Sequence, residues 1–210
     1  MSAPPLKTPA TLRPTQSDLE AFGCYGMHMS ADDFLSLGQT RERYELVHGV
    51  VCMSPRPNTF HQRLLSLFIY QLEGFIRANR GFKYLPDVDL VLAGQTVYAP
   101  DIVCYRPGRV VGYPTRLETP PDLIIEILSY GTKGFDLTTK REGYEKSGVG
   151  EYWTYDPTDG EPKGKLRCAR RASAADAFVD APVTGDAFAS TGVPGFVLDL
   201  TSLREAASGG

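Results

Sequence analysis

The stretch that decides the fold is Pro121-Asp122-Leu123-Ile124-Ile125-Glu126-Ile127-Leu128-Ser129. Residues 123–128 are all apolar except Glu126, and such a run is typical of a central strand that is buried on both faces of a sheet. A buried carboxylate costs several kcal/mol of folding free energy unless it is paired with a cation or bound to a metal ion. Glu126 is therefore a candidate functional residue as well as a marker of the core.

Patterns on both sides of this strand predict the other elements. A first helix is expected to begin near Ser30, whose hydroxyl can cap it. Apolar residues at helical spacing predict a second helix over residues 60–78, and a third is expected over 135–147. Short segments rich in valine, isoleucine or aromatic residues predict further strands over residues 44–51, 88–92, 97–105, 151–155, 165–170 and 196–198. The last two are expected to be edge or terminal strands.

This order of elements predicts an α/β (α+β) fold in which helices flank a mixed β-sheet. We expect a flexible arm and lead-in over residues 1–29, one domain over 30–205 and a flexible tail over 206–210. A chain of 210 residues is long enough to bury one sizeable core.

The composition excludes several classes of protein. Hydrophobic residues make up 42% of the chain and charged residues 22%, which excludes a disordered protein, a collagen-like repeat and a coiled coil. The formal net charge of −3 gives no overall basic surface, so DNA binding would need a local basic face or metal ions. The four cysteines have no Cys-x-x-Cys spacing, which argues against a zinc ribbon or a redox dithiol.

No targeting or membrane segment is recognisable. The first residues contain four prolines and no continuous apolar run, so we expect no secretory signal. The most apolar stretch, residues 64–76, is too short to cross a bilayer. We therefore expect a cytoplasmic protein without a membrane partner.

Two more acidic residues occupy predicted strands. Asp101 follows Pro100 and opens an apolar run, and Glu45 lies in the first strand. Carboxylates on neighbouring strands of one sheet would form an oxygen-lined site suited to Mg²⁺ or Mn²⁺. Asp101 and Glu126 are the expected metal ligands.

Lys140 follows Glu126 by 14 residues and lies in the third predicted helix. Asp136 and Lys140 are spaced i,i+4, and Tyr144 continues the same helix face. If that face packs over the strand that carries Glu126, the ammonium can stabilise developing negative charge or orient a water. The alternative is a surface ion pair between Asp136 and Lys140.

These residues form a series that resembles a known family. The motifs, in chain order, are Arg43-Tyr44-Glu45-Leu46, His61, Pro100-Asp101-Ile102-Val103, the stretch 121–129, Asp136-x-x-x-Lys140-x-x-x-Tyr144 and Gly148-Val149-Gly150-Glu151-Tyr152-Trp153. From about residue 30 to residue 200, their order and spacing resemble the Uma-two family of restriction-endonuclease-like proteins. That family belongs to the PD-(D/E)xK nuclease superfamily, whose core is a mixed sheet flanked by helices.

The resemblance implies a Mg²⁺- or Mn²⁺-dependent endonuclease that hydrolyses phosphodiester bonds of DNA. Asp101 and Glu126 would hold the metal ion, which activates water and neutralises the scissile phosphate. Glu45 would complete the site. The superfamily lysine normally lies two residues after the second acid, where this chain has Leu128, so the resemblance offers Lys140 instead. His61 and Tyr144 are candidates for the substrate side.

Two features depart from this scheme or stay open. The family commonly has Ser-Pro-Ser-Thr after the glutamate strand, whereas this chain has Ser129-Tyr130-Gly131-Thr132, and the missing proline could loosen the turn before Lys140. The chain has one basic run, which consists of Lys163, Lys165, Arg167, Arg170 and Arg171. One face of the strand in this run could contact phosphates, or the run could be the charged edge of a sheet.

Two other functions remain open at this point. The chain could be a binding module that keeps the nuclease fold without catalysis, or a phosphodiesterase that acts on RNA or on a nucleotide. A homodimer is also expected to suit an enzyme that cuts two strands, because two sites are then available.

Overall fold

The computed structural model describes residues 23–209, except residues 39, 41 and 174. The predicted flexible arm therefore lies outside the described residues over positions 1–22, whereas residues 23–29 are described. Cys24 and Met29 in this lead-in are buried against the first hairpin, and His28 forms an isolated β-bridge with Val50.

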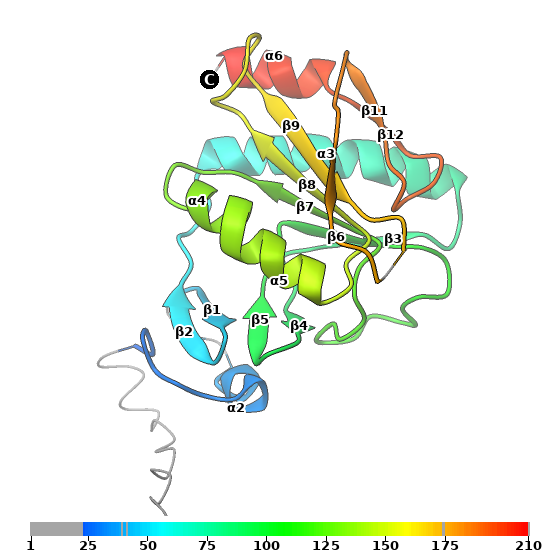
Figure 1. The fold of residues 1–210 in the computed structure, drawn as a ribbon. Coiled ribbons are helices and arrows are strands. Elements are labelled where there is room, and N and C mark those ends of the chain that lie inside the picture. The colour runs from blue at the N-terminus through cyan, green and yellow to red at the C-terminus, as the bar shows by residue number, and fades with distance from the viewer. Residues whose placement is uncertain (1–22, 39, 41, 174, 210) are drawn as a thin grey trace, which may run out of the picture.

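Helices and strands follow one another in a mixed order (Figure 1). In chain order they are α2 (Ala31–Ser36), β1 (Tyr44–Val47), β2 (Val50–Met53), α3 (Thr59–Ala78), β3 (Lys83–Pro86), β4 (Leu90–Leu92), β5 (Thr96–Tyr98), β6 (Ile102–Tyr105), β7 (Leu123–Ile127), α4 (Lys133–Phe135), a π-helical turn (Asp136–Lys140), α5 (Arg141–Lys146), β8 (Glu151–Asp156), β9 (Lys165–Arg170), β10 (Val179–Ala181), β11 (Ala187–Ala189), β12 (Val197–Asp199) and α6 (Thr201–Gly209).

The largest sheet has six strands in the order β10-β9-β8-β7-β6-β3. Strands β7 and β8 are parallel, and the other neighbours in this sheet are antiparallel. The predicted mixed sheet is therefore confirmed, and β7, from the stretch that opened the sequence, is a central strand with all five residues buried. A second, antiparallel sheet has the order β2-β1-β5-β4, and β11 pairs with β12.

Both faces of the six-stranded sheet are covered (Figure 1). On one face α3 contributes Leu64, Phe68 and Leu72 to a core that also holds the odd-numbered residues of β7. On the other face α5 and the four-stranded sheet pack over the even-numbered Ile124. The alternation of side chains along β7 thus places Glu126 under α5, on the same face as Ile124.

The predicted strand over residues 44–51 is wrong, because the segment is a hairpin. His48 and Gly49 have φ values of 50° and 80°, and two residues with positive φ make the tight turn that joins β1 to β2. The His-Gly pair does not carry the usual Asn-Gly or Asp-Gly signal of such a turn, so the sequence pattern alone does not separate the two strands.

The predicted strand over 97–105 is also two strands, and they belong to different sheets. Strand β5 ends at Tyr98 and β6 begins at Ile102, with Pro100 between them. Proline lacks the N–H that a sheet ladder needs, so the chain leaves one sheet and enters the other at this point. This crossing sets Asp101 at the junction of the two sheets.

The structure bears on four smaller expectations. Helix α3 agrees closely with the helix predicted over 60–78, and Ser30 caps α2 by accepting a hydrogen bond from the Asp33 amide at 3.1 Å. Strand β9 was expected at an edge, but it lies between β8 and β10. Residues 206–209, expected as a flexible tail, are the end of α6, and Ala207 is buried.

Candidate active site

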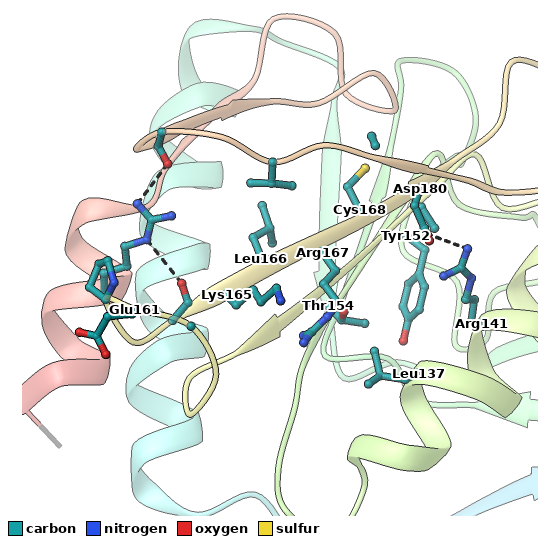
Figure 2. Close-up of a pocket in the computed structure, with 18 residues that line it drawn as sticks. Leu137, Arg141, Tyr152, Thr154, Glu161, Lys165, Leu166, Arg167, Cys168 and Asp180 are labelled. Carbon is teal, nitrogen blue, oxygen red and sulfur yellow. Dashed lines mark hydrogen bonds and ion pairs between the residues drawn. The ribbon is translucent and has the colours of Figure 1, made fainter.

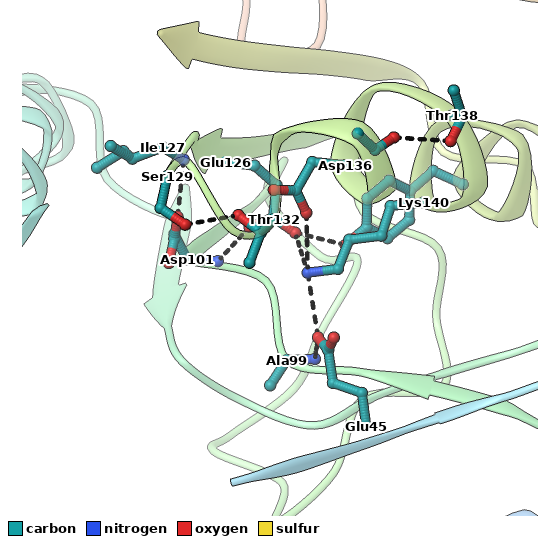
Figure 3. Close-up of polar contacts among 12 residues, drawn as sticks. Glu45, Ala99, Asp101, Glu126, Ile127, Ser129, Thr132, Asp136, Thr138 and Lys140 are labelled. Atoms are coloured by element: carbon teal, nitrogen blue, oxygen red, sulfur yellow. Dashed lines mark hydrogen bonds and ion pairs between the residues drawn. The ribbon is translucent and has the colours of Figure 1, made fainter. Parts of the chain in front are cut away.

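Asp101 and Glu126 lie side by side at one end of the six-stranded sheet (Figure 3). Strands β6 and β7 pair Ile102 with Ile125, so the next antiparallel pair is Asp101 with Glu126, on the face under α5. The Asp101 amide donates to Glu126 Oε2 at 3.3 Å, and the Ile127 amide donates to Asp101 Oδ2 at 2.7 Å. Main-chain groups of two paired strands therefore fix both carboxylates.

Lys140 lies at the centre of the carboxylates that the sequence singled out (Figure 3). Its Nζ is 3.0 Å from Glu126 Oε1, 3.1 Å from Glu45 Oε1 and 3.5 Å from Asp136 Oδ1. The side chain is 7% exposed, so the alternative of a surface ion pair with Asp136 is wrong. The π-helical turn Asp136–Lys140 carries both residues, and such turns are frequent at functional sites.

Glu45 reaches the site from the other sheet. It lies on β1, is 4% exposed, and its Oε1 accepts a hydrogen bond from the Ala99 amide at 3.0 Å. Residue 99 directly precedes the Pro100-Asp101 crossing, so Glu45 holds the crossing and the ammonium of Lys140 at once. The site therefore joins both sheets and the helical segment over them.

His61 and Tyr144 take different places. His61 is in the first turn of α3, and its Nε2 is 3.1 Å from Asp101 Oδ2 at the wall of the cavity. Tyr144 is fully buried, and its hydroxyl donates to Glu126 Oε1 at 2.8 Å. A side chain without exposed surface cannot reach a substrate, so Tyr144 orients Glu126, in contrast to the substrate-side position expected for it.

A cavity of about 280 Å³ opens over these groups. Its walls come from the loop between β2 and α3, which includes Arg56 and Asn58, and from the loop between β7 and α4, which includes Tyr130. The second loop forms a hydrogen-bonded turn although it lacks the family's proline. The Ser129 and Thr132 hydroxyls are 3.0 Å apart, and the Ser129 carbonyl accepts from the Lys133 amide at 2.9 Å. The turn before Lys140 is therefore hydrogen-bonded.

The site carries more negative charge than Lys140 balances. Burial raises the pKa of Glu126 to about 8, although the charge of Lys140 opposes this shift. Burial also raises the pKa of Asp136, again against Lys140. For Lys140 itself, burial lowers the pKa, but the charges of Glu126, Glu45 and Asp136 outweigh it and the pKa lies above its ordinary value.

This donor set fits a divalent cation with oxygen preference. Among the described residues, no three His, Cys, Asp or Glu side chains gather in a way that could enclose a metal ion. Mg²⁺ does not need such a cage, because it keeps several waters and is usually held by one or two carboxylates plus phosphate oxygens. Asp101 and Glu126 line one cavity, and the charge of an added cation would oppose the effect of burial that raises the pKa of Glu126.

A larger hollow of about 520 Å³ lies elsewhere, over β9 (Figure 2). It contains part of the basic run, but each of these cations has an acidic partner within the described structure. Arg167 pairs with Asp159, and Lys165 is 3.8 Å from the same carboxylate. Arg141, from α5, is 2.7 Å from Asp180. This side of the strand is therefore a charge-paired surface and contains none of the predicted site residues.

Glu151 is a further buried acid, and the sequence pattern did not mark it as structurally important. Glu151 is fully buried, and its Oε2 accepts hydrogen bonds from the Ser190 hydroxyl at 2.6 Å, the Thr191 amide at 3.0 Å and the Gly192 amide at 2.7 Å. It anchors the loop between β11 and β12 onto β8. Its place at the start of a predicted strand was visible, but its hydrogen-bond partners lie about 40 residues later, so no local pattern reveals the contact.

The fold and the site define a protein of the restriction-endonuclease-like class, and comparison with known proteins agrees. The family model described as "Uma2: Putative restriction endonuclease" matches residues 31–200. The chain therefore belongs to the Uma2 family.

A solved structure shares the fold. A crystal structure described as a "putative nuclease belonging to DUF820" from Anabaena variabilis ATCC 29413 superposes with a TM-score of 0.67. The two sequences are 20% identical, and the match covers 85% of this chain and 99% of the other. At this identity the likeness shows the fold alone. No curated protein matches the chain.

None of the helices among the described residues is long and apolar enough to cross a membrane.

Proposed function

We propose that the protein is a Mg²⁺-dependent endonuclease that hydrolyses phosphodiester bonds of DNA. The single observation that carries the proposal is the junction of the two sheets, where Asp101 and Glu126 share a cavity with a buried lysine. Family membership supports phosphodiester hydrolysis, and the donor set supports a divalent cation.

In this proposal each side chain has a separate task. Asp101 and Glu126 would hold the metal ion, which would supply an activated water and offset charge on the scissile phosphate. Lys140 fixes Glu126 Oε1 and stabilises the negative charge that develops on the phosphate. Glu45 and Tyr144 hold Lys140 and Glu126 in place. His61 contacts Asp101 from the cavity wall, where it can accept or donate a proton.

Cleavage of supercoiled plasmid tests the proposal. Wild type with Mg²⁺ should convert the plasmid to nicked and linear forms, and EDTA should stop the reaction. Asp101→Asn, which keeps the shape and removes the charge, should lose the activity. Asp186→Asn is the matched control, because Asp186 is exposed, pairs with Arg204 and lines neither the active-site cavity nor the other hollows of the described structure.

Two results would contradict the proposal. One is cleavage by Asp101→Asn at the wild-type rate. The other is a wild type that leaves DNA intact but degrades an RNA of the same sequence, which would assign the site to RNA.

A further inference from the structure

A hollow lined by arginines lies at the end of the six-stranded sheet opposite the candidate site. Its volume is about 630 Å³. Strand β6 connects the two regions, because it starts after Asp101 and ends before Arg106. Five residue steps of about 3.3 Å each separate the two ends by about 16 Å. The residues that matter for its charge are Arg106, Arg109, Arg170, Arg171 and Asp122.

Positive charge dominates this arginine hollow in a chain whose formal net charge is −3. Four guanidinium groups line it, and Asp122 is the one acidic residue among its lining residues. Asp122 lies between two of them, 3.7 Å from Arg106 Nε and 3.6 Å from Arg109 Nε. One carboxylate cannot balance Arg106, Arg109 and Arg170 together, which distinguishes this hollow from the charge-paired surface over β9.

Arg106 and Arg109 are held in place by main-chain carbonyls. Arg106 donates to the Gly192 carbonyl at 2.9 Å and to the Thr191 carbonyl at 2.7 Å. Arg109 donates to the Pro120 carbonyl at 2.8 Å. A guanidinium has five N–H donors, so both retain donors for an anion while their positions are fixed. Side-chain entropy is thus already lost before a ligand arrives, which favours binding.

The other two arginines come from the end of β9 and the residue after it. The Arg171 guanidinium donates to the Glu145 carbonyl and stacks over the Phe178 ring, 4.9 Å from its centroid. Arg170 is half-buried, and its guanidinium forms no hydrogen bond or ion pair with any described residue. These residues are the second half of the basic run in the sequence, and the fold brings them next to Arg106 and Arg109.

We propose that the arginine hollow binds adjacent phosphate groups, as a nucleic acid strand or a free polyphosphate presents them. Arginine suits this chemistry because its planar fork matches phosphate oxygens. The hollow is then a second anion site that works without the metal ligands. The inference that a nucleic acid supplies these phosphates rests on the proposed function, whereas the inference that the hollow binds phosphate groups does not.

Two binding measurements on the full chain test this proposal in EDTA, which prevents cleavage. Inorganic tripolyphosphate is titrated by calorimetry, and a labelled DNA duplex of about two helical turns is titrated by fluorescence anisotropy. Arg170→Ala and Arg109→Gln should weaken tripolyphosphate binding about tenfold each. Loss of one phosphate contact should also reduce the salt dependence of duplex binding by about one unit of slope.

Two further variants serve as controls. Arg80→Ala makes the same charge change at an exposed residue outside the hollow and should bind like wild type. Asp101→Asn alters the candidate active site and should also keep binding, so a failure of the proposed function leaves this result intact. Thermal melting checks that each variant is folded, and Arg170→Ala removes no hydrogen bond or ion pair among the described residues.

The two titrations distinguish a site for nucleic acid from a site for free polyphosphates. Binding of tripolyphosphate without binding of the duplex would assign the hollow to free polyphosphates, and binding of both would assign it to nucleic acid as well. Unchanged affinity in both Arg170→Ala and Arg109→Gln would overturn the proposal. Loss of tripolyphosphate binding in Asp101→Asn would overturn it too, because the anion would then lie in the active-site cavity.

Discussion

At the scale of single residues, the ammonium of Lys140 organises the candidate site. Three carboxylates, from Glu45, Glu126 and Asp136, lie within 3.5 Å of its Nζ, and each comes from a different element. A buried cation among several carboxylates keeps its charge, and it fixes the direction of the oxygens around it. The superfamily position of the lysine holds the buried Leu128, so the helical segment supplies the charge from above the strand.

Lys140→Ala tests this role. We expect the rate of DNA cleavage to fall at least about 100-fold, because removal of one preorganised group that stabilises transition-state charge has effects of this size. The matched control is Lys133→Ala, which lies on the same helical segment but pairs with Asp156 at 2.7 Å. Cleavage kinetics on plasmid DNA give both rates. Equal losses in the two variants would contradict the special role of Lys140.

The raised pKa of Glu126 predicts how the metal-free protein responds to pH. Because burial raises the pKa of the folded carboxyl to about 8, the folded state keeps a proton that the unfolded chain releases at lower pH. The free energy of unfolding should therefore fall as the pH rises from the ordinary glutamate range to about 8. Urea unfolding in EDTA at pH 5, 6, 7 and 8 measures this decline.

Glu126→Gln provides the control for this pH effect. The amide cannot ionise, so the decline should be smaller than in wild type. An identical pH dependence in the two proteins would show that another group is responsible.

At the scale of elements, the first turn of α3 links local capping to the site. The Asn58 side chain accepts a hydrogen bond from the His61 amide at 2.8 Å, and both residues line the cavity. The helix was predicted well because its apolar spacing is regular over 20 residues. The cap and the contact between His61 and Asp101 could not be predicted, since they depend on how the helix end meets β6.

Asn58→Ala should lower the free energy of unfolding by about 1 kcal/mol, the usual cost of losing a side-chain cap. The cleavage rate should also fall, because the turn that carries His61 becomes less ordered. Asn58→Asp keeps an oxygen acceptor and should retain stability near that of wild type. Chemical unfolding and plasmid cleavage measure the two effects. Full stability of Asn58→Ala would contradict the capping role.

At the scale of the whole molecule, the candidate site exists because two sheets meet. The sequence indicated Asp101, Glu126 and Glu45 separately, since each is acidic among apolar neighbours. It did not indicate the arrangement, because the hairpin at His48 and the crossing at Pro100 decide which sheet each strand joins. The burial of Asp136 could not be predicted for the same reason. The i,i+4 spacing of Asp136 and Lys140 is the same whether the helical segment is exposed or packed against a sheet.

Glu151 provides a further test at this scale, because it joins distant parts of the chain. Glu151→Ala leaves the Ser190 hydroxyl and two amides of the 190–192 loop without their acceptor. We expect a loss of about 3 kcal/mol in unfolding free energy, in the range for unsatisfied buried donors. Urea unfolding measures it, with the exposed Glu142→Ala as control. Equal stabilities of the two variants would contradict the anchoring role.

The central claim is that Asp101 and Glu126 form a divalent metal site, and calorimetric titration with Mn²⁺ tests it most directly. Wild type and the double variant Asp101→Ala, Glu126→Ala are titrated under the same conditions. The account predicts saturable binding by wild type and no binding by the double variant. Absence of binding by wild type, or equal binding by both proteins, would contradict it.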